Sequence, residues 1–365
     1  MRQRIKRIFE NLGKNAPEAI FINYGGVKDY SFFYVTGFTG GSFEGSSAII
    51  RKDGSCTAII PQLEENTARK ENGKNRLGNE LLIFKTGKEH IDFLKKELRE
   101  IKNIGCDLSA LSVNTHNRLK TETHAKIADV GTAIRDARAI KDGIEIAKIR
   151  EAVEIAEKAF ERVIEGDVVE AGARESDVAA ELAYQMQRIG GTPSFPTIVA
   201  GGKNSAEPHY LTGSEKLRKN QFVLIDWGAK FKRYNSDMTR TFALGRANEK
   251  QLRMFEVVED AQEVAFDLMQ EGVDAASVHS AVSDFISKTE FKGKFVHSTG
   301  HSLGLQVHDG KTLGNEKFEL KENMVFTVEP GIYVSGIGGV RLEEDVLIRK
   351  NGIEKLSGKN RFFEL

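Results

Sequence analysis

The chain has few cysteines and no excess of charge of either sign. Its 365 residues include only Cys56 and Cys106, whose spacing matches no metal-binding or redox motif. Both are expected to be small core residues rather than a disulfide, which fits a reducing cytoplasm. Lys and Arg together number 53, as do Asp and Glu, so the formal net charge is zero. No overall field therefore favours nucleic acid or an anionic membrane as a partner.

The chain also lacks long apolar segments. Its apolar runs are far shorter than the about 20 residues that a transmembrane helix needs. The first residues, MRQRIKRIFENLGKN, are basic but contain no apolar segment of the kind found in a secretory signal. Apolar residues recur there at helical spacing instead, which predicts an amphipathic first helix. We therefore expect a cytoplasmic protein.

The length suits two domains. Residues 1–133 alternate short apolar strand-like runs with helix-like segments, which predicts an N-terminal domain of the α/β (α+β) class. A glycine-rich segment, residues 36–45, lacks both GxGxxG and GxxxxGK[ST], so we interpret it as a turn-rich connection and not a phosphate-binding loop. The charged stretch 134–143 is expected to be a linker to a second domain, residues 144–365.

The second domain repeats one pattern: two long helix-like segments, a loop and a hairpin-like segment. The first copy covers residues 144–245 and the second covers residues 248–349, with matching positions about 104 residues apart. We interpret this as an internal duplication, which predicts two halves related by a pseudo-twofold axis. Asp142 and Ser176 are expected to cap the two helices of the first half.

Each expected hairpin carries an acidic pair. In the first, an apolar strand leads into Asp226, and a second strand opens directly after Asp237. A turn centred between Phe231 and Lys232 would place the two aspartates directly opposite each other on one face of the sheet. A turn centred at Gly336 would likewise oppose Glu329 and Glu343.

A pseudo-twofold fold would bring these four carboxylates together. Either pair alone also fits ordinary acids at the solvated ends of a hairpin. Four buried carboxylates, however, cannot all stay ionised without counter-charge, and the nearby Arg240 and Arg341 are too few to supply it. With a histidine from the segment TGHSLGLQVHD, the two aspartates and two glutamates form a hard, oxygen-rich set that matches two divalent ions. Two such ions activate water and polarise a carbonyl, so the set predicts hydrolysis.

The motifs around these residues are specific. Asp226, the run DMTRT from Asp237, His301, the run EPGIY from Glu329 and the run RLE ending at Glu343 together resemble the five-ligand signature of the pita-bread metallopeptidases. Within these, the run FPTIVAG from Phe195 and the run PHY around His209 resemble the Xaa-Pro peptidases, meaning prolidase and aminopeptidase P. The resemblance covers the whole chain, and it implies a creatinase-like N-terminal domain followed by a pseudo-twofold pita-bread domain.

The resemblance also implies roles for the ligand residues. Asp226 would bind one ion, Asp237 and Glu343 would bridge both, and His301 and Glu329 would complete opposite sides. The ions implied are manganese, cobalt or zinc. A bridging hydroxide would attack the scissile carbonyl, and Glu329 would carry its proton.

Further residues are implied to bind substrate or assist catalysis. His209 would stabilise the tetrahedral intermediate, and His297 and His308 would line the substrate site. A hydrogen-bonded structural histidine is the alternative for each. Arg341 would orient a carboxylate or the substrate, or would form an ion pair with Asp345 or a ligand. Tyr333 would face the site, with a packed core tyrosine as the alternative.

One position departs from the resemblance. Ser302 stands where prolidases usually have glycine, and we expect it to alter the pocket wall and not metal binding. The implied function is hydrolysis of Xaa-Pro bonds by a homodimer. A dipeptidase is favoured over aminopeptidase P because the chain is short. Three alternatives remain: a methionine aminopeptidase, a creatinase-type enzyme and a non-catalytic binding protein on this fold. The first usually lacks so large an N-terminal domain. The other two typically lack these metal ligands.

Overall fold

The computed structural model describes residues 1–358 and 363–365. The chain divides into two compact units, Met1–Arg138 and Ala139–Leu365. The division falls inside the stretch expected as a linker, and residues 134–139 form the end of a helix, α6 (Gly131–Ala139). They are helical rather than extended because Ile134, Ala137 and Ala139 are buried. Among the described residues, no helix combines the length and the apolar composition that a membrane span requires.

The first unit is built on a six-stranded mixed sheet with the order β4-β3-β2-β1-β5-β6. A cluster of buried side chains from β1, β5 and α4 packs on it, among them Phe21, Ile104 and Leu98. Cys56 and Cys106 are both buried, and burial raises the pKa of each thiol to about 12. The elements in chain order are α1 (Arg2–Leu12), β1 (Ala19–Tyr24), α2 (Ser31–Thr36), β2 (Ser46–Arg51), β3 (Cys56–Pro61), α3 (Glu65–Lys74), β4 (Glu80–Phe84), α4 (Gly87–Leu98), β5 (Asn103–Cys106), α5 (Val113–Thr123), β6 (Lys126–Asp129) and α6.

The glycine-rich segment of the first unit is indeed a connection between elements. Its amides are bound by carboxylates of the chain itself. Glu71 accepts from the backbone N–H groups of Thr39 and Gly40, and Glu64 accepts from those of Ser42 and Phe43.

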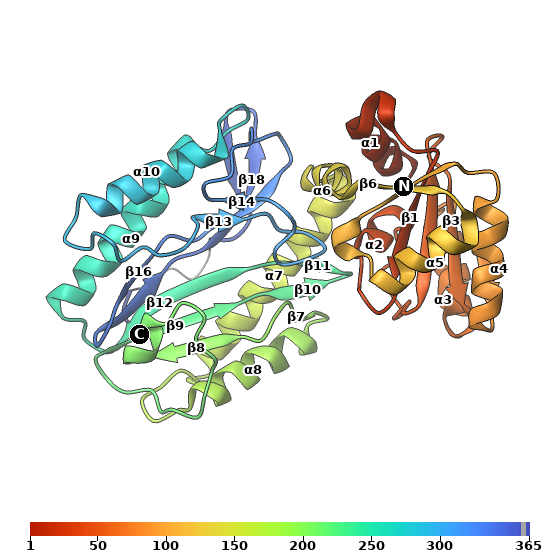
Figure 1. Cartoon of the computed structure of the whole chain (residues 1–365). Helices are drawn as coiled ribbons and strands as arrows, with labels where there is room; N and C mark the ends of the chain where they lie inside the picture. Colours follow the sequence, from red (N-terminus) through yellow and green to blue (C-terminus); the bar gives the residue numbers. More distant parts are fainter. Residues whose placement is uncertain (359–362) are drawn as a thin grey trace. The chain divides into compact units, whose positions relative to one another are not determined.

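The second unit contains the duplicated pattern. Its first half comprises α7 (Gly143–Glu165), α8 (Glu175–Arg188), β7 (Thr192–Pro193), β8 (Ile198–Gly201), the 3₁₀ helix η4 (Gly202–Ala206), β9 (Gln221–Trp227), β10 (Ala229–Phe231), β11 (Tyr234–Asn235) and β12 (Met238–Leu244). Its second half comprises α9 (Glu249–Leu268), α10 (Ala275–Ser287), β13 (Gly300–His301), β14 (Thr312–Leu313), β15 (Val325–Val328), β16 (Gly331–Val334), β17 (Gly338–Arg341), β18 (Glu344–Arg349) and β19 (Gly352–Lys355). Within this unit, α9 and α10 lie on one side of the strands and α8 lies on the other (Figure 1).

The two halves also repeat individual backbone hydrogen bonds. Glu175 N donates to Glu215 O in the first half, and Ala275 N donates to Phe318 O in the second. The amide of Leu217 donates to Ala173 O, as that of Leu320 does to Val273 O. The capping residues repeat as well: Asp142 and Asn248 each form a capping box at the start of the first helix. Ser176, in contrast, is not a cap, because α8 begins one residue earlier, at Glu175.

The first hairpin differs from the expected register. Asp226 pairs with Thr239, not with Asp237, because the turn lies at Lys232 and Arg233. Asp237 precedes Thr239 by two residues, so the two aspartates still share a face, as diagonal neighbours. Gly228 lies opposite Asp237. A side chain does not fit there, because a Cβ atom would lie 1.9 Å from Ser236 O.

The second hairpin has the expected register around Gly336. Gly331 pairs with Arg341 near the turn, and Val328 pairs with Glu344 further out. Glu329 and Glu343 lie in the interval between these two paired segments, at opposing positions. The ladder is thus interrupted where its two acidic side chains project.

Candidate active site

The acidic pairs of both hairpins line one cavity of about 440 Å³. Among its lining residues are nine of the ten side chains expected at the site: His209, Asp226, Asp237, His297, His301, His308, Glu329, Arg341 and Glu343. Phe195, Ile198, Pro208 and Val307 supply apolar wall. The structure therefore brings together residues that lie more than a hundred positions apart in the sequence.

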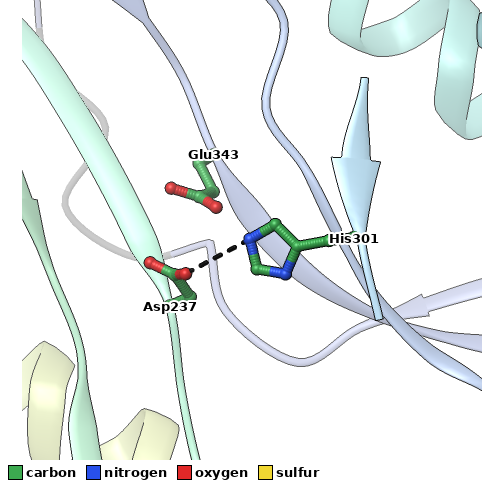
Figure 2. A group of neighbouring side chains, drawn as sticks. All are labelled: Asp237, His301 and Glu343. Carbon is green, nitrogen blue, oxygen red and sulfur yellow. Dashed lines mark ion pairs between the residues drawn. The ribbon is translucent and has the colours of Figure 1, made fainter. Parts of the chain in front are cut away.

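Three of these side chains form a compact group. Asp237, His301 and Glu343 point toward one another in Figure 2, and each offers a ligand atom within 4.8 Å of the other two. His301 Nε2 lies 3.5 Å from Asp237 Oδ2 and 3.6 Å from Glu329 Oε1. Asp237, His301 and Glu343 are all buried.

Hydrogen bonds from neighbouring strands hold the two acids of this group. The backbone N–H of Asp237 donates to Asp345 Oδ2 (3.1 Å), and that of Glu343 donates to Thr239 O (3.1 Å). Thr239 Oγ1 also donates to Glu343 Oε2 (2.7 Å). The two hairpins are thereby joined edge to edge at the centre of the unit.

The carboxyl groups of the site have raised pKa values. Burial, followed by the nearby carboxylates Glu343, Asp226 and Glu329, raises the pKa of Asp237 well above its usual range. Burial raises the pKa of Glu343 well above its usual range and that of Glu329 to about 7. Asp226 also has a raised pKa through burial, although the neighbouring Arg341 lowers it in part. The site is thus short of positive charge for four ionised carboxylates.

Two buried oxygen atoms support the same conclusion. Oδ1 of Asp226 and Oδ1 of Asp237 have no hydrogen-bond partner among the described residues. A buried carboxylate oxygen without a donor is costly, and a divalent cation bound to both would satisfy them. The oxygen-rich donor set with one imidazole suits a hard or borderline cation.

His301 has the chemical form that a metal ligand needs. Burial, followed by the nearby His308, lowers the pKa of its imidazole to about 3, so the ring is neutral. Its Nδ1 lies 3.4 Å from Ser302 O, which places the ring proton on Nδ1. The lone pair of Nε2 therefore faces Asp237 and Glu329.

Behind these groups lies a hydrogen-bonded chain. Arg341 forms an ion pair with Asp226, with 2.6 Å between Nη2 and Oδ2, which was one of the alternatives expected for it. Its Nη1 donates to the hydroxyl of Tyr333 (2.9 Å), and that hydroxyl lies 2.8 Å from His297 Nε2. Because His297 Nδ1 lies 2.8 Å from Ser298 O, the ring proton belongs on Nδ1 and Tyr333 donates to Nε2. Arg341 and Tyr333 thereby hold Asp226 and His297 in place.

Metallopeptidase family M24 matches residues 147–350, more than half of the chain. The chain belongs to this family. A Creatinase/Prolidase N-terminal domain matches residues 4–140, so the M24 metallopeptidase part follows the N-terminal domain that the motifs implied. The family's use of divalent metal agrees with the buried Asp237, His301 and Glu343 group.

Relatives of this M24 protein cover almost its whole length. It is 35% identical to an Xaa-Pro dipeptidase of Pyrococcus horikoshii, over 99% of this chain and 98% of the relative. The crystal structure of the prolidase from Pyrococcus horikoshii has a TM-score of 0.87 at 35% identity and covers 98% of this chain and 99% of that chain. An X-Pro aminopeptidase from Thermotoga maritima has a TM-score of 0.89 at 31% identity, with 99% of this chain and all of that chain covered.

Two residues named from the sequence lie outside the cavity lining of the M24 site. Tyr333 is not among the cavity's lining residues, because its hydroxyl is turned to His297 and Arg341. Ser302 does not form pocket wall either: it is buried, and its hydroxyl accepts a hydrogen bond from Lys311 N (2.9 Å). The serine thus supports the pairing of β13 with its neighbour.

Three residues hold the site in roles that were not anticipated from the sequence. Thr239 and Asp345 bind the ligand residues directly, as described above. Gln262, which is fully buried on α9, donates through Nε2 to Val328 O (2.8 Å) and Leu342 O (2.9 Å). These carbonyls precede Glu329 and Glu343, so Gln262 fixes the interrupted ladder where the glutamates project. Its position on the apolar face of a long helix was the only available signal.

Proposed function

We propose that this protein hydrolyses the peptide bond between an N-terminal residue and proline, with two divalent ions per subunit. The proposal rests chiefly on the convergence of Asp226, Asp237, His301, Glu329 and Glu343 in one cavity, with buried carboxylate oxygens that lack partners. Manganese, cobalt and zinc are the ions to test. Bound ions would supply Lewis acidity and an activated water.

The remaining steps fall to the side chains of the cavity. Glu329, whose Oε1 faces His301, would accept the proton of the attacking water and pass it to the leaving nitrogen. His209, at the mouth, would donate a hydrogen bond to the oxyanion, and His308 would contact the substrate beside it. The ring of His308 is fixed against His301, with 4.1 Å between ring centroids. Arg341 would act by orienting Asp226, and Tyr333 by orienting His297.

The substrate follows from the relatives and from the cavity wall. Proline has no N–H in the scissile bond and a fixed φ, so proteases that bind extended strands handle it poorly. Phe195, Ile198 and Val307 offer apolar surface in this cavity. An Xaa-Pro dipeptidase is the favoured activity, in line with the Pyrococcus relatives.

Aminopeptidase P activity is the second candidate, and one observation favours it. A second cavity of about 450 Å³ shares His297, Ser298 and Thr312 with the first. An exopeptidase that removes a single N-terminal residue can use additional space only for residues that follow the proline. The adjoining cavity would accommodate them.

The test compares Ala-Pro, Ala-Pro-Ala, Ala-Ala and a Met-Ala peptide, with metal content measured on the same samples. After loading with Mn²⁺ or Co²⁺ we expect Ala-Pro to be cleaved faster than Ala-Pro-Ala, and after chelation we expect neither to be cleaved. Faster cleavage of Ala-Pro-Ala would favour the aminopeptidase P activity instead. Glu329→Gln should lower the rate more than the metal content. Full activity of demonstrably metal-free protein would refute the mechanism, and cleavage of Met-Ala alone would refute the proline specificity. From the resemblance we also propose a homodimer, which size-exclusion chromatography with light scattering can test, and from the two unpaired cysteines a cytoplasmic location.

A further inference from the structure

We infer that Glu175 is a positioning residue for His209, acting through the loop that carries this histidine over the cavity. The inference rests on the proposed function, in which His209 stabilises the oxyanion. Nothing in the motifs around the ligands points to Glu175, because it lies at the start of α8, outside the cavity lining.

The carboxylate of Glu175 binds three groups of the His209 loop. Its Oε1 accepts from Gly201 N (2.8 Å) and from Asn204 Nδ2 (2.9 Å), and its Oε2 accepts from the Tyr210 hydroxyl (2.9 Å). Asn204 Nδ2 also lies 3.0 Å from the Tyr210 hydroxyl, which closes the network. The side chain is thus fully engaged, and the residue is only 1% exposed.

The backbone at Glu175 holds the far end of the same loop. Glu175 N donates to Glu215 O (3.0 Å), and Ser176 N donates to Gly213 O (3.0 Å). The segment 201–215 is therefore tied at its start, its middle and its end to the first turn of α8. This first turn carries the partial positive charge of a helix N-terminus, which favours a carboxylate there.

The position of His209 follows from what holds its two neighbours in the chain. His209 is exposed at the cavity mouth, directly before Tyr210. Burial, followed by the hydrogen bond to Glu175, raises the pKa of Tyr210 to about 12, so its hydroxyl remains a donor. On the other side of His209, Pro208 O accepts from Arg341 Nη1 (3.4 Å). The backbone of His209 is thus fixed between Tyr210, held by Glu175, and Pro208, held by Arg341.

The second half of the unit shows that the fold itself does not need a carboxylate at this place. Ala275 occupies the equivalent position, since its N–H donates to Phe318 O as that of Glu175 does to Glu215 O. The repeated backbone forms with alanine there. The glutamate occurs in the half whose following loop carries His209, which associates it with the site and not with the scaffold.

A double-mutant cycle tests the inference. Glu175→Ala should lower kcat/KM for Ala-Pro by about 10–100-fold, the range expected when a catalytic group is displaced by about an ångström. In a His209→Ala background, the same substitution should cost less than about twofold, because the group it positions is gone. Full additivity of the two losses would overturn the inference.

Milder variants and a matched control guard against misfolding. Tyr210→Phe should lower kcat/KM about fivefold, because it removes one of the three groups that Glu175 binds. Glu175→Gln, which keeps one acceptor oxygen, should lose less than Glu175→Ala. Tyr234→Phe is the control: its hydroxyl donates to the buried Glu145 (3.0 Å) within the same unit, and neither residue lines the cavity. It should leave kcat/KM unchanged, and a loss equal to that of Tyr210→Phe would contradict the inference.

A measurement independent of activity separates this inference from the proposed function. Amide hydrogen exchange over residues 198–214 should accelerate at least about tenfold in Glu175→Ala and stay at the wild-type rate in Tyr234→Phe. Unchanged exchange in Glu175→Ala would refute the positioning role. If the wild type cleaves no proline peptide, the proposed function fails, whereas accelerated exchange would still support the clamp on the loop.

Discussion

The two halves of the second unit share a backbone pattern but differ in how they hold their acidic side chains. In the first half, the β9–β12 ladder is continuous from Gln221 to Trp227, and it presents aspartates. In the second half, the ladder is interrupted beside Glu329 and Glu343, and the side chain of Gln262 bridges the carbonyls at the interruption. The half with the longer acidic side chains thus has the less regular backbone.

The helices show the same difference. Ala156 in α7 and Gln262 in α9 lie at the same distance from their capping residues, Asp142 and Asn248. In the first half, the indole of Trp227 donates to the Ala156 carbonyl (3.0 Å). In the second half, the helix supplies the donor and the hairpin supplies the acceptors. The duplication therefore fixed the path of the chain, while the polar contacts that aim the ligands diverged in each half.

The largest expected effects come from one acid of each half, Asp237 and Glu343. Asp237→Asn and Glu343→Gln each remove one negative charge that would bridge both ions. Both should lower metal content, and both should reduce activity by more than the about 10–100-fold typical of losing an outer partner. The measurement is elemental analysis beside peptidase assays. Unequal metal loss in the two variants would show that the two halves do not contribute equally to metal binding.

A substitution of Gln262 tests whether the interrupted ladder of the second hairpin matters for metal binding. Gln262→Met leaves two buried carbonyls without their donor and should cost about 1–3 kcal/mol in the free energy of unfolding. It should also weaken metal affinity about tenfold or more, because these carbonyls adjoin both glutamates. Gln251→Met, in the capping box of the same helix, is the matched control. It should destabilise the fold but leave metal affinity intact, and equal affinity in both variants would refute a specific role for Gln262.

Removal of the metal should make the stability of the folded protein depend on pH, because the carboxyl groups of both acidic pairs then lie close together without a cation. The folded pKa of Glu329 is raised from 4.5 to about 7, so the folded metal-free protein binds a proton that the unfolded chain releases. This contribution to stability is complete below pH 4.5 and is lost as the pH rises through about 7. Chelated protein should therefore unfold at lower denaturant concentration at pH 8 than at pH 6, beyond any change in the loaded protein. The opposite slope would contradict the raised pKa.

The smallest effect is expected at Ser302. Ser302→Gly removes the hydroxyl that accepts from Lys311 N and should cost about 0.5–1.5 kcal/mol of stability. Activity should stay within about twofold, because the side chain lies outside the cavity lining. A larger change in KM would restore the expectation that this serine shapes the pocket wall.

The sequence predicted the register of one hairpin and not of the other, for a physical reason. In the second hairpin, Gly336 and Gly338 have positive φ (82° and 140°). Glycines favour this conformation, so the glycine-rich segment predicted the position of the turn. In the first, the two-residue turn is formed by Lys232 and Arg233, which also have positive φ (44° and 74°). Turns of this kind normally contain Asn or Gly, so nothing in these two residues indicated its position.

The site shows the same limit. Asp226 could be predicted because an aspartate directly follows an apolar strand, and His301 because the motifs around it resemble the family signature. Glu175 and Gln262 could not, because each binds groups of a segment distant in sequence. Only the folded arrangement reveals which carbonyl or amide a buried polar side chain meets.

The two thiols of the first unit have a practical consequence. A thiolate is the reactive form of cysteine, and Cys56 and Cys106 are 5% and 0% exposed with pKa values of about 12. Alkylating reagents at neutral pH should therefore leave the native chain unmodified. A single cysteine introduced at Leu63, which is 96% exposed, would then accept a fluorophore or spin label at one position, without removal of either natural cysteine.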